Sequence, residues 1–139
     1  MPTMFRSRYS QPAGSAYAEV VAEARREYHK IQKITPRRAP YVRAAYFKKD
    51  KVFINSFWEH LNQKPVRDRR RRLKLYLCAI DLIRNSTDAP STSLNPNNTN
   101  ELLYRFEGKT ADGIIFQVQL KENKKKKRKN FISVFPVRK

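Results

Sequence analysis

Residues 101–120 read ELLYRFEGKTADGIIFQVQL, and this stretch decides the fold. Apolar residues alternate with polar ones on both sides of the turn GKTADG at residues 108–113. A period of two is typical of a β-strand with one buried face, so the stretch predicts a β-hairpin. Residues 130–137, NFISVFPV, alternate in the same way and extend the hairpin to a three-stranded meander.

The alternation also assigns the two faces of the predicted meander. The core face takes the larger apolar side chains, which are Leu102, Tyr104, Phe106, Ile114, Phe116, Val118, Leu120, Ile132 and Val134. The reverse face takes Arg105, Gln117, Gln119, Lys121, Phe131, Ser133 and Phe135. A register change of one residue in the last strand would exchange its two sets. The reverse face is compatible with an ordinary solvated surface, and also with a platform for phosphate, ribose and unpaired bases.

Helices are predicted ahead of the meander. Apolar residues at spacings of three and four predict a helix over residues 15–34, and residues 50–56 (DKVFINS) alternate as a strand. Ser56 and Glu59 form a capping box that opens a short helix, and Pro65 allows a long helix over residues 66–85 to begin. The predicted fold is α+β, with the N-terminal helices packed on one face of a small antiparallel sheet of about four strands.

The length of 139 residues corresponds to a single domain. Residues 1–14 are predicted to be a basic flexible arm, and residues 15–139 a single α+β domain. Residues 85–100 (NSTDAPSTSLNPNNTN) contain almost nothing that a core could bury, so they predict a mobile loop within that domain.

The charge balance indicates a polyanionic partner. The chain has 31 Lys and Arg residues against 12 Asp and Glu residues, a net charge of +19, divided evenly between its halves. A basic folded body favours nucleic acid over an anionic membrane. Cys78 is the only cysteine, which excludes an intrachain disulfide and a cysteine-based zinc site. No signal peptide or membrane-spanning run is recognisable, so we expect a cytoplasmic protein without a membrane partner.

Two runs of cations stand out. Lys124 to Lys129 separate two strand-patterned segments, so they are predicted to lie at a hairpin tip and bind phosphate; an accessible nuclear import signal is the alternative. Arg67 to Arg72 (RDRRRR) begin the predicted long helix, where cations oppose the helix dipole. Arg69 and Arg72 are nearest the apolar stripe and are predicted to project toward the sheet edge.

Residues with catalytic potential are few. His29 and His60 are the only histidines, and no cluster of acidic residues accompanies them, so no metal site and no cofactor are predicted. Paired carboxylates and a Gly-rich phosphate loop are also missing from the sequence. His60 is either an ordinary helix-surface histidine or a proton carrier, because the pKa of an imidazole lies near neutrality.

The order of these elements resembles the small RNase toxins of the RelE/barnase/EndoU-type superfamily, often called the BECR fold, and especially its phage-associated members. Five stretches carry the likeness: KVFINSFWEHL, RLKLYLCAIDLIRN, ELLYRFEGKT, FQVQLKENKK and NFISVFP. Together they span roughly residues 45–136.

The resemblance implies metal-independent cleavage of RNA, in which the ribose 2′-hydroxyl attacks the adjacent phosphorus. The implied catalytic residues are Arg105 and Lys121 for phosphate charge, Ser133 and Gln119 for orienting the 2′-hydroxyl, and His60 as the base brought in from a helix. The implied and predicted nucleic-acid-binding residues are Lys48, Lys49, Arg69, Arg72, Gln117, Lys124, Lys125, Lys126, Lys127, Arg128, Lys129, Phe131 and Phe135.

Three functions remain open from the sequence. The first is an endoribonuclease of toxin type, with an acidic neutralising protein or the ribosome as a partner besides RNA. The second is a non-catalytic RNA-binding module that uses the same face. The third is a basic DNA-binding or nuclear protein, although no helix-turn-helix or zinc-finger pattern is present.

Overall fold

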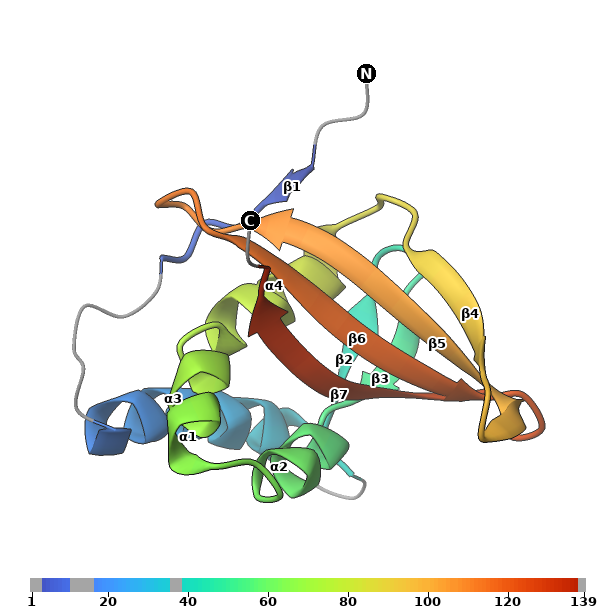
Figure 1. Ribbon diagram of the computed structural model, residues 1–139, viewed down its shortest axis with the longest axis horizontal. Helices are drawn as coiled ribbons and strands as arrows, with labels where there is room; N and C mark the ends of the chain where they lie inside the picture. Colours follow the sequence, from blue (N-terminus) through green and yellow to red (C-terminus); the bar gives the residue numbers. More distant parts are fainter. Residues whose placement is uncertain (1–3, 11–16, 36–38, 138–139) are drawn as a thin grey trace.

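The computed structural model describes residues 4–10, 17–35 and 39–137. Within these residues, seven strands form one mixed, strongly curled sheet, accompanied by four helices (Figure 1). The strand order is β1-β5-β6-β7-β3-β2, and β4 also pairs with β5. The predicted α+β class is therefore confirmed.

The C-terminal meander forms as predicted. It consists of three antiparallel strands, β5 (Asn98–Lys109), β6 (Ile115–Asn123) and β7 (Arg128–Pro136). Phe116 and Val118 of β6 are both 0% exposed, as the alternation requires of a core face. Ile114 is an exception, because it precedes the strand and stays 39% exposed.

A β-bulge in β7 overturns part of the predicted face assignment. Gln119 pairs with Ser133, but the next residue of β6, Leu120, pairs with Phe131, so Ile132 is one extra residue in β7. A bulge shifts the alternation by one position. Phe131 therefore joins the core at 0% exposure, and its predicted place on the reverse face is wrong. Ile132, predicted to lie in the core, is only half-buried.

Four further strands complete the sheet. They are β1 (Phe5–Arg6), β2 (Tyr41–Ala44), β3 (Asp50–Phe53) and β4 (Ser91–Asn95). Of these, the sequence predicted only β3. The sequences of the other three show no sustained alternation of polar and apolar residues. Both β1 with β5 and β3 with β7 are parallel pairs, so the prediction of a purely antiparallel sheet of about four strands is wrong.

Two segments expected to lack structure contribute to the sheet. The predicted mobile loop at residues 85–100 contains β4, which pairs with β5 from Ser91↔Arg105 to Asn95↔Asn98. The predicted flexible arm at residues 1–14 contains β1 in its described part, residues 4–10. Ser7 in that part is buried, and its hydroxyl donates to the carboxylate of buried Asp81, at 2.8 Å. Backbone and side-chain hydrogen bonds thus order segments that have little apolar surface.

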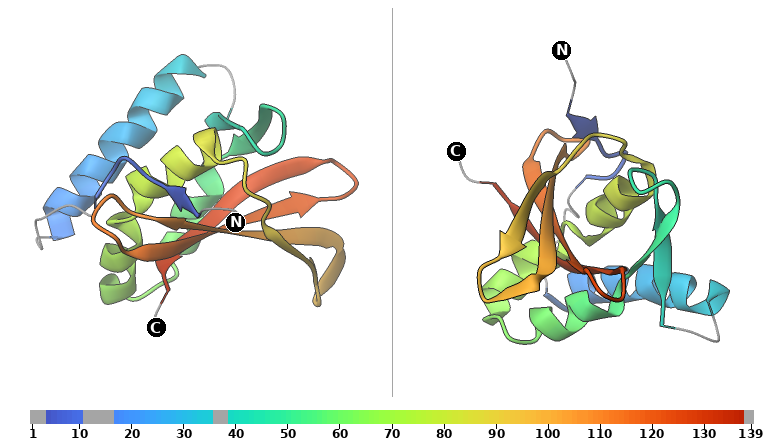
Figure 2. Two further views of the ribbon diagram at one scale, coloured as in Figure 1. Left: turned by 90° about the horizontal axis from the view of Figure 1, so that it is seen from above. Right: turned by 90° about the vertical axis from the view of Figure 1, so that its right-hand side faces the viewer.

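The helices lie on the concave side of the sheet and at its edge. Their bounds are α1 (Tyr17–Ile34), α2 (Asn55–Leu61), α3 (Val66–Leu73) and α4 (Tyr76–Asn85). Helix α4 lies inside the curl, between the meander and the β2–β3 hairpin (Figure 2). Every residue from Cys78 to Ile83 is buried, including Asp81, so α4 is the centre of the core.

The single long helix predicted over residues 66–85 is divided into α3 and α4. The break falls at Lys74 and Leu75, and Leu75 is 0% exposed whereas Val66 is 50% exposed. One straight helix over residues 66–85 would bury only a single stripe of side chains. The break instead lets α4 bury side chains on all sides, so tertiary packing overrides the helical periodicity of the sequence. The predicted capping box is also wrong: Ile54 is the N-cap of α2, and no side chain caps the helix.

Helix α2 continues directly from β3 and lies along β7 (Figure 1). The ring of Phe57 stacks on that of Phe131, with centroids 4.7 Å apart and an interplanar angle of 6°. Offset stacking at this separation is favourable beyond the area that it buries. The stack therefore fixes α2 beside β7, and α3 follows along the same strand.

A candidate nucleic-acid interface

The outer face of the meander, the side turned away from α4, carries a row of polar side chains. Strand pairing places Arg105 opposite Gln119 and Gln119 opposite Ser133, so these residues of β5, β6 and β7 are neighbours across the sheet. The sequence predicted all three for this face, and the register confirms their juxtaposition.

Helix α3 extends this row beyond the edge of the sheet. The Nη1 of Arg72 donates a hydrogen bond to Oγ of Ser133, and the Arg72 guanidinium lies 5.6 Å from the centroid of the Phe135 ring. Partial burial lowers the pKa of Arg72, although a guanidinium stays protonated at any physiological pH. The predicted projection of Arg72 toward the sheet edge is therefore confirmed.

A groove runs between α2 and the outer face of β6 and β7, and we call it the α2–β7 groove. Its two adjoining depressions, of about 180 and 340 Å³, share His60 and Ile132 in their linings. The first is also lined by Phe57, Leu61, Lys64, Arg72, Gln119, Ser133 and Phe135. The second is also lined by Ser56, Glu59, Glu101, Lys121, Asn123, Lys126, Arg128 and Asn130. Five cations against two carboxylates make the lining basic.

His60 lies midway along the groove and is partly buried. This burial lowers the pKa of its imidazole, and the positive charge of Lys121 lowers the pKa further, whereas Glu59 opposes the shift. The imidazole is therefore neutral at pH 7 and able to accept a proton. Lys121 itself forms an ion pair with Glu101, with Nζ 3.6 Å from the carboxylate oxygen. His60 and Lys121 thus belong to the same site, as predicted.

Several predicted site residues lie outside the groove. Arg105 and Gln117 line a separate depression of about 520 Å³ beside β4. The guanidinium of Arg69 donates to the backbone carbonyls of Asn62 and Lys64, so it closes the turn between α2 and α3. Lys48 and Lys49 are exposed in the β2–β3 turn, where both adopt a left-handed backbone conformation.

The basic run forms the tip of the β6–β7 hairpin, as predicted. Lys124, Lys125, Lys126 and Lys127 are exposed, and Oδ1 of Asn123 accepts hydrogen bonds from the backbone N–H groups of Lys125 and Lys126. This bonding fixes the turn and leaves the lysine side chains in solvent. Of the four, only Lys126 lines the groove.

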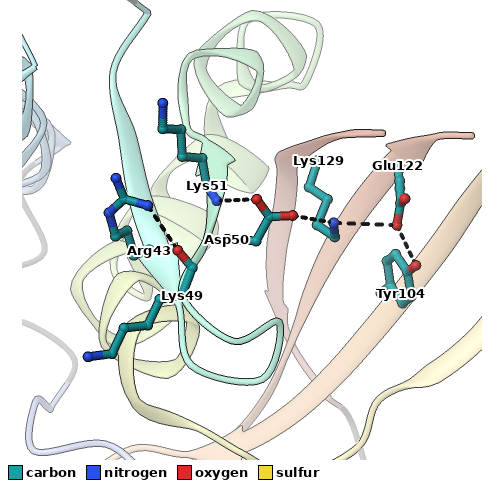
Figure 3. Close-up of polar contacts among 7 residues, drawn as sticks. All are labelled: Arg43, Lys49, Asp50, Lys51, Tyr104, Glu122 and Lys129. Carbon is teal, nitrogen blue, oxygen red and sulfur yellow. Dashed lines mark hydrogen bonds and ion pairs between the residues drawn. The ribbon is translucent and has the colours of Figure 1, made fainter. Parts of the chain in front are cut away.

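Lys129 does not belong to the exposed run. Its side chain is 8% exposed and points to the core side of the sheet, where Nζ lies 2.7 Å from Oδ2 of Asp50 and 3.8 Å from Oε1 of Glu122 (Figure 3). Glu122 also accepts a 2.5 Å hydrogen bond from the hydroxyl of Tyr104. The predicted place of Lys129 at the exposed hairpin tip is therefore wrong, because its ammonium group is buried between two carboxylates, and this pairing argues against a role in binding nucleic acid.

Nothing in the sequence indicated Lys64 and Asn130, which line the groove, or Tyr41, Arg43, Lys51 and Phe53 on strands β2 and β3. Residues 50–56 predicted strand β3, but residues 41–44 (YVRA) do not alternate between polar and apolar side chains, so the pairing of β3 with β2 was not recognisable.

Comparison with known proteins does not identify a family for this chain. No protein-family model, curated protein or solved structure matches it.

The described residues also contain no evident metal site. In residues 4–10, 17–35 and 39–137, no three His, Cys, Asp or Glu side chains lie close enough together to hold a metal ion. None of the helices in this part of the chain has the length and apolar character needed to cross a membrane.

Proposed function

We propose that the protein binds RNA in the α2–β7 groove and cleaves it as a metal-independent endoribonuclease of toxin type. The observation that carries the proposal is the convergence of His60, Arg72, Gln119 and Ser133 on one basic depression. These groups come from α2, α3, β6 and β7. Cleavage of a phosphodiester requires a base to remove a proton from the nucleophile and cations to stabilise the negative charge that develops on the phosphate. This depression contains both kinds of group.

The reaction uses the 2′-hydroxyl of the RNA as the nucleophile. Neutral His60 accepts the proton of this hydroxyl, and the 2′-oxygen forms a bond to the adjacent phosphorus. Arg72 and Lys121 stabilise the negative charge that develops on the phosphoryl oxygens. The bond from phosphorus to the 5′-oxygen then breaks, and the 5′-oxygen takes up a proton from solvent. The products carry a 2′,3′-cyclic phosphate and a 5′-hydroxyl.

Ser133 and Gln119 orient the reactants in this scheme. Arg72 donates to Oγ of Ser133, which leaves the serine hydroxyl hydrogen free to bond a phosphoryl or ribose oxygen. Gln119 lies directly opposite Ser133 in the sheet. Arg105, next in the row, binds a flanking phosphate instead of the reacting one, because it lines a different depression.

The element order supports membership of the BECR-fold superfamily of RelE-, barnase- and EndoU-like RNases. Strand β3, then helices and then the β5-β6-β7 meander occur in the implied order, but three helices, α2 to α4, stand where the resemblance implies two, and strand β4 lies in the segment that it implies to be a loop. A toxin of this kind would be held inactive by an acidic neutralising protein, to which the net charge of +19 is complementary.

A second function, RNA binding without cleavage, is favoured by one specific observation. His60 is the only histidine that lines the groove in the described residues, so no second imidazole is available there to protonate the leaving group. In this case the protein would use the same cations on the same RNA, for example on a ribosome.

The two functions separate in a cleavage assay with labelled RNA in EDTA, scored for 2′,3′-cyclic phosphate ends. We expect His60→Gln to abolish cleavage but to retain RNA binding, since glutamine keeps a polar side chain of similar length. His29→Gln is the matched control, because His29 is exposed on α1 and bonds only Gln32 in the described residues. RNA that stays intact at high protein excess, with binding that weakens steeply in salt, supports the binding module instead. Equal affinity for duplex DNA would support the third function, DNA binding.

A further inference from the structure

The β2–β3 hairpin presents a pair of aromatic rings on its outer surface. Tyr41 and Phe53 are direct cross-strand partners, and their ring centroids lie 5.9 Å apart in an edge-to-face arrangement. The next pair along the two strands, Val42 and Val52, points into the core, with 3% and 0% of each residue exposed. Tyr41 and Phe53 are only half-buried and lie on the opposite surface.

Three cations surround these rings. The guanidinium of Arg43 lies 5.5 Å from the Tyr41 ring centroid, the ammonium of Lys51 lies 4.9 Å from the same centroid, and the guanidinium of Arg128 lies 3.8 Å from that of Phe53. In the described part of the chain, none of the three forms an ion pair with a carboxylate. Arg43 donates one hydrogen bond to the backbone carbonyl of Lys49, at 3.0 Å, and its remaining N–H groups can bind an anion, as can Lys51 and Arg128.

This aromatic patch, made of Tyr41, Arg43, Lys51, Phe53 and Arg128, is continuous with the α2–β7 groove. Phe53 pairs with Asn130 across β3 and β7, and Asn130 pairs with Lys121 across β7 and β6. Asn130, Lys121 and Arg128 all line the groove. Because neighbouring strands lie about 4.8 Å apart, Phe53 is about 10 Å from Lys121 and Tyr41 about 15 Å.

We propose that the aromatic patch is a second subsite that stacks an unpaired base of the RNA strand lying in the groove. The proposal rests on the proposed RNA-binding function and specifies its substrate as single-stranded. A base held in a duplex has both faces covered and cannot stack on a protein ring, whereas an unpaired base can. Arg43 and Lys51 bind the phosphates on either side of that base, and Arg128 connects the subsite to the groove.

The test compares two unstructured RNA oligonucleotides, ~4 and ~12 nucleotides long, that span the usual range of single-strand site sizes. Both are 2′-O-methylated, so that the nucleophile is blocked and binding is measured without cleavage. The protein variant is Tyr41→Leu, which removes the ring face and keeps an apolar cover over Phe53. We expect the short oligonucleotide to lie in the groove and the long one also to reach the patch.

We expect Tyr41→Leu to weaken binding of the long oligonucleotide about 5- to 150-fold, the range for losing one stacked base, and to leave the short one unaffected. Tyr41→Phe keeps the ring and is expected to bind like the wild type. Lys51→Gln is expected to reduce the salt dependence of long-oligonucleotide binding by about one phosphate contact. The control is Tyr46→Leu, because Tyr46 is 37% exposed but packs on Phe47 and Phe106, away from the patch.

Four results would overturn the subsite. If Tyr41→Leu binds the long oligonucleotide as tightly as the wild type does, the stacking subsite is refuted, whereas the proposed RNA binding in the groove is not. An equal loss for the short oligonucleotide, or for Tyr46→Leu, would show a general effect on folding. Wild-type protein that binds neither oligonucleotide would refute the RNA-binding function and the subsite together. A preference for duplex RNA over the single strand would refute stacking alone.

Discussion

Lys129 and Lys126 provide a direct test of which lysines in the basic run support the fold and which bind the ligand. We consider the same substitution, to Met, at both positions. Methionine retains the length of the aliphatic stem and removes only the charge. Lys129 is 8% exposed between two carboxylates, whereas Lys126 is exposed at the hairpin tip and lines the groove.

The loss of folding free energy in Lys129→Met depends on how well the carboxylates of Asp50 and Glu122 are solvated once the ammonium group is removed. Removing one member of a buried ion pair costs about 3–5 kcal/mol, because an unpaired charge is left behind. The side chain of Asp50 is 52% exposed and can be hydrated, so losing its ion pair costs only about 0–1 kcal/mol. The side chain of Glu122 is 14% exposed and would keep only the hydrogen bond from the Tyr104 hydroxyl, so most of the destabilisation comes from Glu122. We therefore expect a loss of about 2 kcal/mol. For 139 residues this corresponds to a decrease in Tm of about 7 °C.

The assays are urea unfolding for stability and RNA titration at several salt concentrations for binding. We expect Lys129→Met to be destabilised, with unchanged RNA affinity for the folded fraction. Lys126→Met should unfold within about 0.5 kcal/mol of the wild type but bind RNA more weakly, with a smaller salt dependence. The opposite pattern, in which Lys129→Met folds normally and loses affinity, would refute the assignment of Lys129 to the fold.

Three further predictions concern the core, the N-terminal segment and the groove. Phe131→Ala should cost about 3–5 kcal/mol in urea unfolding, because it leaves a cavity opposite Phe57; a cost below ~1 kcal/mol would place the ring outside the core. Asp81→Ala should cost about 2–4 kcal/mol and expose residues 4–10 to protease, since its carboxylate accepts from Ser7 Oγ, Arg8 N and Asn85 Nδ2; unchanged protease resistance would argue against this anchor. The folded pKa of His60 is lowered, so cleavage should persist below pH 6.5 and fall only as the imidazole becomes protonated; a rate that falls already above pH 6.5 would exclude His60 as the base.

The parts of the fold that the sequence predicted are those with long, regular alternation. The meander has nine or more residues in each strand, and residues such as Phe116 and Val118 follow the period of two without interruption. The strands that were missed have two to five residues, and their pairing depends on contacts far along the chain. The break between α3 and α4 at Leu75 could not be predicted either. It is favourable only because the sheet curls around α4 and buries side chains on all sides of that helix.

The site was predicted as a set of residues but not as an arrangement. Gln119, Ser133 and Lys121 follow from the alternation, and Arg72 follows from its place on the helix face. The position of His60 beside them depends on α2 lying along β7, which no local pattern indicates. The basic run shows the same limit, since six adjacent cations give no sign that Lys129 turns inward to meet Asp50 and Glu122.

The bulge at Ile132 connects the core to the groove. Without the extra residue, Phe131 and Ser133 would share one face of β7, and either the ring or the hydroxyl would be misplaced. With it, Phe131 turns inward to stack on Phe57 and hold α2 against β7, while Ser133 turns outward to meet Arg72. Ile132 itself lies between the two depressions of the groove, beside His60. The irregularity that made the last strand unpredictable is thus the feature that brings the helical and sheet residues of the groove together.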